Sequence, residues 1–257
     1  MKTLILSVHI DGGQSHVWRD LQPKFVAETQ GHYEYGVVVN GDDPARHSNV
    51  ISHLPVKTSH RQALEVVMGL FKSHRDRFSH FLLLDSDCFP VRPDWQQVLV
   101  KLMGSQYQYA APVRTENFDL FPHPSAFFMT RDFLDQANFD FQQLPNLLGM
   151  WVSDVGAAMP KIAGGAQIWH PLVKTNYLAP HPVYASIYGD LFYHHCAGSR
   201  GLGFRANSYR CYDHLFGRND HKKIYRRLTA QLQARPRAFI DGLRGMRQRS
   251  TNKAAGK

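Results

Sequence analysis

The stretch Phe81-Leu82-Leu83-Leu84-Asp85-Ser86-Asp87 is the most informative part of this 257-residue sequence. Four consecutive apolar residues are too few for a helix and are typical of a central strand that is buried on both faces of a sheet. The two aspartates follow at the carboxyl end of that strand, where open α/β sheets place their ligands. An Asp-x-Asp triplet is common by chance, so its position after a buried strand is what makes it informative.

The residues before this stretch predict alternating strands and helices. The apolar run Thr3–Ile10 and the β-branched run Tyr35–Asn40 each end in turn residues and are typical of buried strands. Between them, Val17–Gln30 predicts a helix in which Pro23 either interrupts the helix or marks its first turn. Arg61–His74 carries apolar residues at helical spacing and predicts an amphipathic helix facing a sheet. This alternation favours an α/β fold of the Rossmann-like kind.

The second half of the chain is less regular. Residues 109–113 and 125–129 predict two further short strands, in a region rich in proline, histidine and aromatic residues. Loops of this composition commonly form substrate-binding surfaces.

Asp85 and Asp87 suggest a metal site. Paired carboxylates repel each other, and a cation that lies between them removes that cost. Oxygen ligands suit Mg²⁺ or Mn²⁺, and such an ion in turn binds diphosphate oxygens. The simpler alternative is a solvated turn in which Asp85 caps the next segment.

An apolar strand that ends in Asp-x-Asp, after two earlier strands and a helix, resembles the GT-A-fold glycosyltransferases of the family 2-like kind. The resemblance covers about residues 3–205 through short motifs only. It implies a mixed GT-A sheet flanked by helices, a divalent metal at Asp85 and Asp87, and a nucleotide-diphosphate sugar as the donor substrate.

The same resemblance implies five further nucleotide contacts. They lie at the ends of the first two strands and before the second helix, at His9, Asp11, Asn40, Asp42 and Arg61. The alternative is that the strand-end residues are ordinary turn residues and that the arginine is a solvated helix start.

A late histidine supports the metal hypothesis. Several GT-A enzymes supply a further metal ligand from a His-x-x-Gly context, which His195 and Gly198 match, with His194 as the alternative ligand. Arg200 could then pair with phosphate. A zinc site formed by the two histidines with Cys196 and Cys211 is a weaker alternative, because three adjacent side chains do not easily reach one metal ion.

The general base, if the enzyme inverts, must be a carboxylate near the acceptor hydroxyl. Asp154 precedes a small-residue stretch and is the first candidate, although it could equally cap a helix, and Asp119 is the second candidate.

The net charge of +9 is concentrated near the C-terminus. From residue 214 onward the chain contains 12 of its 30 Lys and Arg residues but only 2 of its 21 acids. We therefore expect a GT-A-like domain over residues 1–213 and a basic amphipathic helical extension over 214–257. Such an extension suits an anionic membrane surface and not a nucleic-acid groove, unless its apolar stripe packs on the domain.

Three cysteines cannot pair completely, and no apolar run is long enough to span a membrane. We therefore expect a cytoplasmic protein, which is peripheral on the inner face of the membrane if the extension binds lipid.

The expected activity is sugar transfer from a nucleotide-diphosphate donor to a hydroxyl of a glycan or glycolipid acceptor, as in surface polysaccharide or glycolipid synthesis. One alternative is a haloacid-dehalogenase-like phosphatase, a family that this Asp-x-Asp strand end also resembles. In that family's motif a Thr or Val stands where this chain has Phe89. The other is a non-catalytic adaptor that binds a nucleotide or a membrane.

Overall fold

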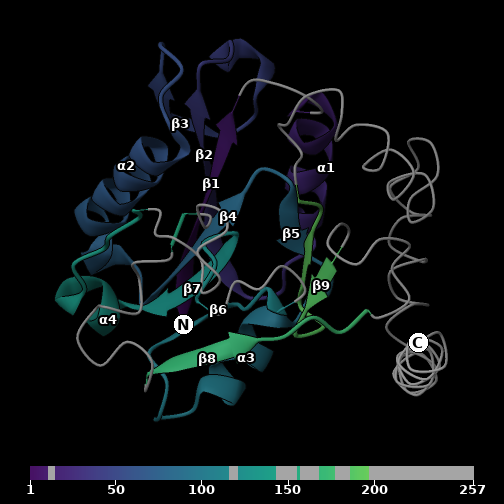
Figure 1. The fold of residues 1–257 in the computed structure, drawn as a ribbon, viewed down its shortest axis with the longest axis vertical. Helices are drawn as coiled ribbons and strands as arrows, with labels where there is room; N and C mark the ends of the chain where they lie inside the picture. Colours follow the sequence, from purple (N-terminus) through teal and green to yellow (C-terminus); the bar gives the residue numbers. More distant parts are fainter. Residues whose placement is uncertain (11–14, 116–120, 143–154, 157–167, 177–185, 197–257) are drawn as a thin grey trace, which may run out of the picture.

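A computed structural model describes residues 1–10, 15–115, 121–142, 155–156, 168–176 and 186–196. Its main feature is a seven-stranded sheet with the strand order β3-β2-β1-β4-β7-β6-β8 (Figure 1). The strands of this sheet are β1 (Lys2–Ile10), β2 (His32–Asn40), β3 (Val50–Leu54), β4 (His80–Asp85), β6 (Tyr109–Pro112), β7 (Ala126–Thr130) and β8 (Trp169–Leu172). A second sheet has three strands, β5 (Cys88–Pro90), β10 (Phe192–His194) and β9 (Ser186–Tyr188).

The large sheet is mixed. The first four strands of the chain, β1 to β4, run parallel, whereas β7 is antiparallel to both β4 and β6. β8 then pairs with β6 in parallel. The predicted mixed α/β sheet flanked by helices is confirmed.

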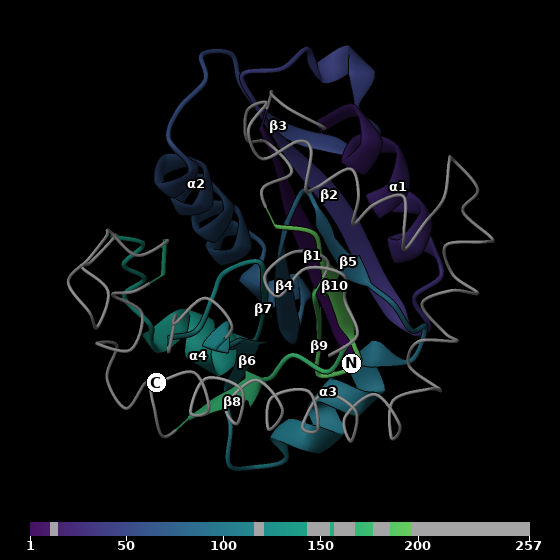
Figure 2. The same ribbon diagram turned by 45° about the vertical axis from the view of Figure 1, so that its right-hand side comes forward.

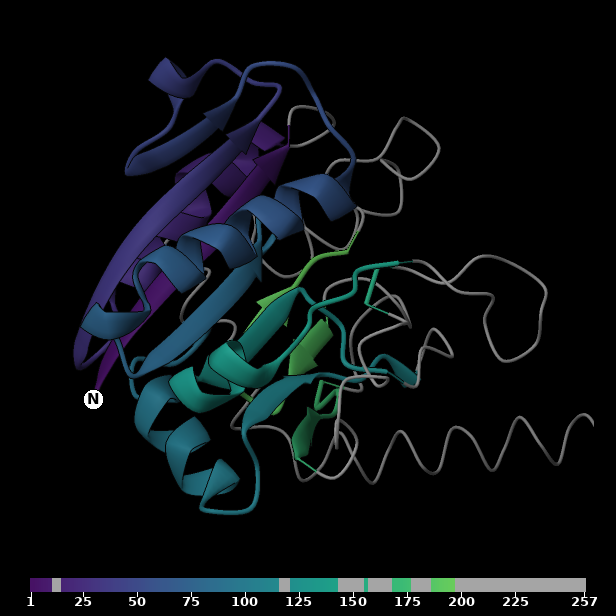
Figure 3. The ribbon, with the colours of Figure 1, turned by 90° about the vertical axis from the view of Figure 1, so that its left-hand side faces the viewer.

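Helices cover both faces of this sheet. The α-helices are α1 (Ser15–Ala27), α2 (His60–Ser73), α3 (Trp95–Met103) and α4 (Arg131–Gln136), with two short 3₁₀ turns, Pro44–Arg46 and Arg75–Arg77. In Figure 1, α1 and α2 lie on opposite sides of the sheet. Figure 3 shows α2 and α4 in front of the same face, and Figure 2 shows the small sheet on the side of α1.

The central strand β4 joins the two halves of the core. Phe81 and Leu83 pack with the buried residues of α2 and α4, whereas Leu82 and Leu84 pack with those of α3 and the small sheet. All four side chains are fully buried, as expected for a strand covered on both faces.

The helix before β4 begins and ends as its sequence requires. Ser59 caps α2, and its side chain and that of Gln62 form a reciprocal capping box. The helix buries five apolar residues, Ala63, Leu64, Val67, Met68 and Phe71. They anchor α2 to the sheet and so fix its first turn above the carboxyl end of β4.

Two expectations need correction. Pro23 neither interrupts nor begins α1 but lies inside it, because burial of Trp18, Leu21 and Phe25 outweighs the cost of about 3 kcal/mol for an interior proline. The edge strand β3 was also missed, which makes the Asp-x-Asp strand the fourth strand and not the third.

The expected extension, residues 214–257, lies outside the described residues. Among the residues that the structure describes, no helix is long and apolar enough to cross a membrane.

We expect Leu83→Ala to lower the free energy of unfolding by about 2–5 kcal/mol, because it removes a fully buried side chain from the core on the α2 side of the sheet. Urea denaturation of the full chain measures this. The control Val56→Ala, at a residue that is 76% exposed, should change the free energy by less than about 0.5 kcal/mol. Equal losses in both variants would contradict the assigned core.

Candidate metal site

The site lies where three parallel strands end. β1, β2 and β4 run in the same direction, so the residues at their carboxyl ends share one edge of the sheet. In the register of these strands Val8 pairs with Asp85, and Ile10 pairs with Asn40. This edge is the usual ligand-binding edge of an open α/β sheet.

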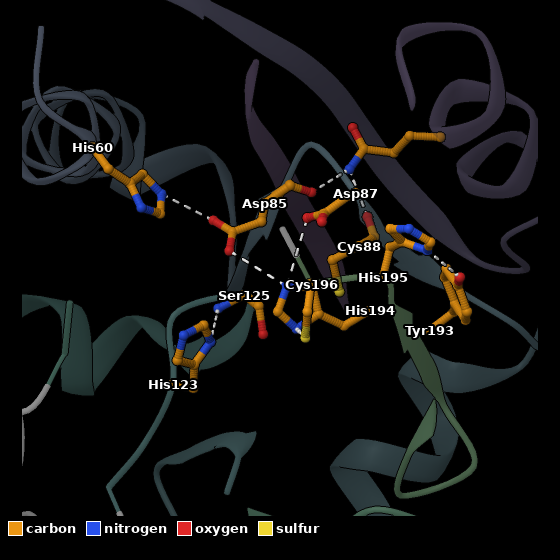
Figure 4. Close-up of polar contacts among 11 residues, drawn as sticks. His60, Asp85, Asp87, Cys88, His123, Ser125, Tyr193, His194, His195 and Cys196 are labelled. Carbon is orange, nitrogen blue, oxygen red and sulfur yellow. Dashed lines mark hydrogen bonds and ion pairs between the residues drawn. The ribbon is translucent and has the colours of Figure 1, made fainter. Parts of the chain in front are cut away.

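Asp85, Asp87 and His194 form one buried cluster at this edge (Figure 4). The Nε2 atom of His194 lies 3.5 Å from Oδ1 of Asp87 and 3.8 Å from Oδ2 of Asp85. The three side chains are only 4–13% exposed. Two carboxylates and an imidazole thus converge on one point, although His194 is more than a hundred residues away in sequence.

The pairing of β5 with β10 brings His194 to this point. His194 pairs with Cys88, and the backbone amide of His195 donates to the carbonyl of Asp87 at 3.0 Å. A tight turn between β9 and β10, with positive φ at Gly189 and Asp190, closes the hairpin. The Leu191 amide donates to the Tyr188 carbonyl across this turn at 2.9 Å.

Strand alternation decides which of the two adjacent histidines faces the carboxylates. Successive side chains of a strand point to opposite faces. His194 therefore faces Asp85 and Asp87, whereas Nδ1 of His195 bonds the Tyr193 hydroxyl at 2.8 Å and its ring contacts Trp18. Burial lowers the pKa of His195 to about 3. The structure thus places the alternative histidine, His194, in the cluster that was expected to contain His195.

Asp85 is held ionised by its surroundings. Burial by itself would raise the pKa of its carboxyl group, but His60, with smaller contributions from His194 and His123, outweighs burial and lowers the pKa to about 2. The strongest of these contacts joins Nε2 of His60 to Oδ1 of Asp85 at 3.0 Å. An ionised, buried carboxylate is well suited to bind a cation.

The buried side chain of Gln22 holds the backbone around the two aspartates. Its amide nitrogen donates to the carbonyls of Asp85 (2.7 Å) and Cys88 (2.6 Å). Its oxygen accepts from the Tyr35 hydroxyl at 2.9 Å and lies 2.8 Å from Nε2 of His9. Because the amide nitrogen is engaged twice, the oxygen must accept from His9, whose Nε2 therefore carries the proton.

Two further residues surround His194: His123, which was missed in the sequence, and Cys196, which was named only as a ligand of the alternative zinc site. The ring of His123 lies 5.6 Å from that of His194, and its Nδ1 accepts from the Ser125 amide at 3.2 Å. The sulfur of Cys196 lies 3.4 Å from Nδ1 of His194. His123 carries no local signal, because it meets His194 only through the folding of separate segments onto β4, whereas Cys196 lies two positions after His194.

Those expected nucleotide contacts that the structure describes have protein partners. Asn40 holds Thr58, accepting from its amide at 2.8 Å and donating to its carbonyl at 3.1 Å. Asp42 contacts Nε2 of His47 at 2.9 Å, and Arg61 contacts the exposed Glu65 at 2.8 Å. His9 is buried against Gln22.

The other expected residues, Asp11, Asp119, Asp154 and Arg200, lie outside the described residues. So do Gly198 of the His-x-x-Gly metal hypothesis and Cys211 of the zinc alternative.

The Asp-Asp-His cluster fits a divalent metal ion. Its ligand atoms lie within 4.8 Å of one another. In octahedral coordination with bonds of about 2.1 Å, neighbouring ligands are roughly 3 Å apart and opposite ligands about 4.2 Å apart. Small side-chain movements therefore bring all three to bonding distance. The three residues offer carboxylate oxygens and an imidazole nitrogen as ligand atoms.

Comparisons with known proteins give little further guidance. No protein-family model matches the sequence, and no curated protein does. Among solved structures, A197 from STIV has a TM-score of 0.41 and 12% identity, over 67% of this chain and 82% of that one. S. aureus TarS 1-349 in complex with UDP has a TM-score of 0.34 and 12% identity, over 44% of this chain and 35% of that one. A second S. aureus TarS structure has the same TM-score and identity, and 21% of its chain is covered. Similarities this low assign no activity to the chain.

We expect His9 to make stability depend on pH. Burial lowers its pKa from 6.5 to about 4, although the Gln22 hydrogen bond opposes this. At His9 the unfolded chain takes up a proton as the pH falls below about 6.5, whereas the folded protein does so only near pH 4. The free energy of unfolding should therefore decrease as the pH is lowered from about 6.5 to about 4. Chemical denaturation at several pH values, with a chelator present, measures this.

The slope should become shallower in His9→Gln, because the amide does not titrate and can still donate to Gln22. The control His53→Gln, at an exposed residue, should keep the wild-type slope. Parallel curves for wild type and His9→Gln would rule out this role for His9.

Proposed function

We propose that this protein is a metal-dependent glycosyltransferase that moves a sugar from a nucleotide-diphosphate donor to an acceptor hydroxyl. The observation that supports this proposal is the buried Asp85-Asp87-His194 cluster at the carboxyl edge of parallel strands. In this proposal all three residues hold Mn²⁺ or Mg²⁺. Their location supports it because diphosphate groups bind at this edge in open α/β sheets.

The proposed reaction exchanges one bond at the anomeric carbon of the sugar. The acceptor oxygen forms a bond to that carbon while the bond to the diphosphate oxygen breaks, and the acceptor proton passes to a base. A bound divalent cation neutralises the charge that develops on the leaving diphosphate. The chain's own contribution is to hold the two carboxylates in place, which the contacts of Gln22 and His60 with Asp85 support.

The base in an inverting reaction is proposed to be Asp154, with Asp119 as the second candidate. A carboxylate within hydrogen-bond reach of the acceptor hydroxyl would accept its proton during attack. Acceptors in surface polysaccharide or glycolipid synthesis would present such a hydroxyl, and the basic residues of 214–257 would hold the enzyme at an anionic surface.

We expect Asp87→Asn to abolish Mn²⁺ binding and sugar transfer, because the amide replaces a charged ligand by a neutral one without changing its size. Calorimetric titration of the full chain with Mn²⁺ measures the first effect. Release of nucleotide diphosphate from a panel of nucleotide sugars measures the second. The control Asp76→Asn alters an aspartate whose side chain is 92% exposed and should behave as wild type.

Wild-type turnover by the Asp87→Asn variant, or by chelator-treated protein, would falsify the metal hypothesis. Release of inorganic phosphate from a phosphate monoester, with no transfer from any nucleotide sugar, would instead support the phosphatase alternative.

We expect Asp154→Asn to keep donor binding but to lower the transfer rate by about 100-fold or more, because the amide no longer accepts a proton. Donor affinity by calorimetry and transfer rate by product formation separate the two effects. A near-normal rate would assign Asp154 to a helix cap and leave Asp119 or a retaining mechanism. The anomeric configuration of the product, read by NMR, is the independent check.

A further inference from the structure

His60 connects the first turn of α2 to the candidate metal site. Its Nε2 atom lies 3.0 Å from Oδ1 of Asp85, the shortest side-chain contact that the structure gives this carboxylate. An ionised carboxylate only accepts hydrogen bonds, so Nε2 is the donor. The other oxygen, Oδ2, is the one that faces His194. The two oxygens of Asp85 therefore have different surroundings (Figure 4).

We propose that His60 is a positioning residue for the metal site, which rests on the metal binding of the proposed function. By occupying Oδ1, His60 orients the Asp85 carboxylate so that Oδ2 faces His194. Without this bond the carboxylate can rotate about its terminal torsion, which is broad and has no strong preference of its own. The metal ion would then have to order Asp85 on binding, and its affinity would fall.

The position of His60 is well defined by its helix. Ser59 and Gln62 form the capping box around it, and the apolar face of α2 is buried in the core. The imidazole is thus presented to Asp85 from a fixed backbone, whereas its side chain is still 29% exposed. Groups that hydrogen-bond to metal ligands commonly act in this way, by fixing the orientation of the ligand.

The contact is not needed to hold α2 in place. The N-terminus of the helix has its cap from Ser59 and Gln62, and five buried apolar residues attach it to the sheet. Removing the imidazole should therefore change metal affinity much more than it changes stability. This difference separates a positioning role from a structural one.

The test is a titration of the full-length protein with Mn²⁺ alone, without nucleotide, followed by calorimetry or by the EPR signal of free Mn²⁺. We expect His60→Ala to weaken Mn²⁺ affinity by about 10–100-fold. His60→Gln retains an N–H donor of similar reach and should recover most of that loss. The control His53→Ala removes an exposed histidine and should bind Mn²⁺ as wild type does. Urea denaturation checks that all variants are equally folded.

The outcomes separate this inference from the function on which it rests. If wild type binds no Mn²⁺, both fail. If Asp87→Asn loses Mn²⁺ but His60→Ala binds it as tightly as wild type or more tightly, the positioning role alone is overturned. The role is also overturned if His60→Ala weakens only the binding of UDP in the presence of Mn²⁺, because His60 would then contact the diphosphate and not orient Asp85.

Discussion

Two carboxylates buried at the end of one strand impose the central constraint on this structure. Asp85 and Asp87 both lie within 4 Å of the same nitrogen of His194, and both are largely removed from water. Like charges at such a separation repel strongly where water does not screen them. Burial would raise the pKa of Asp85, but His60, with smaller contributions from His194 and His123, outweighs burial and lowers it to about 2. The site is therefore arranged around negative charge, as a cation site requires.

The fold supports this arrangement from both faces of the sheet. On one face, α2 brings His60 to Asp85. On the other face, Gln22 of α1 donates to the backbone carbonyls of Asp85 and Cys88, and the small sheet supplies His194. Elements that are distant in the chain thus meet at one edge of the sheet. Strand β4 contributes both Asp85 to the site and apolar residues to the core.

The sequence predicts more of the fold than of the candidate site. The strands β1, β2 and β4 and the helix α2 were predicted because each carries its own periodic pattern of apolar residues. The edge strand β3 alternates only weakly, since it includes Ser52 and His53, and the small sheet is built from strands of three residues. Strands that short contain too few positions for a period to be recognised. The expected metal and nucleotide roles of individual residues stay predictions, as does the membrane role of residues 214–257.

The sequence by itself determined that a buried strand ends in two carboxylates, because a run of four apolar residues followed by Asp-Ser-Asp is a local pattern. It left open which of two adjacent histidines lies near them. The tertiary structure decided this through the register of β10 against β5, which pairs His194 with Cys88 and turns His195 to the opposite face. It also placed His60 against Asp85 and Gln22 beneath the aspartate turn. These contacts join segments that are 25 to 107 positions apart, so they depend on strand pairing and helix packing and leave no trace in local sequence periodicity.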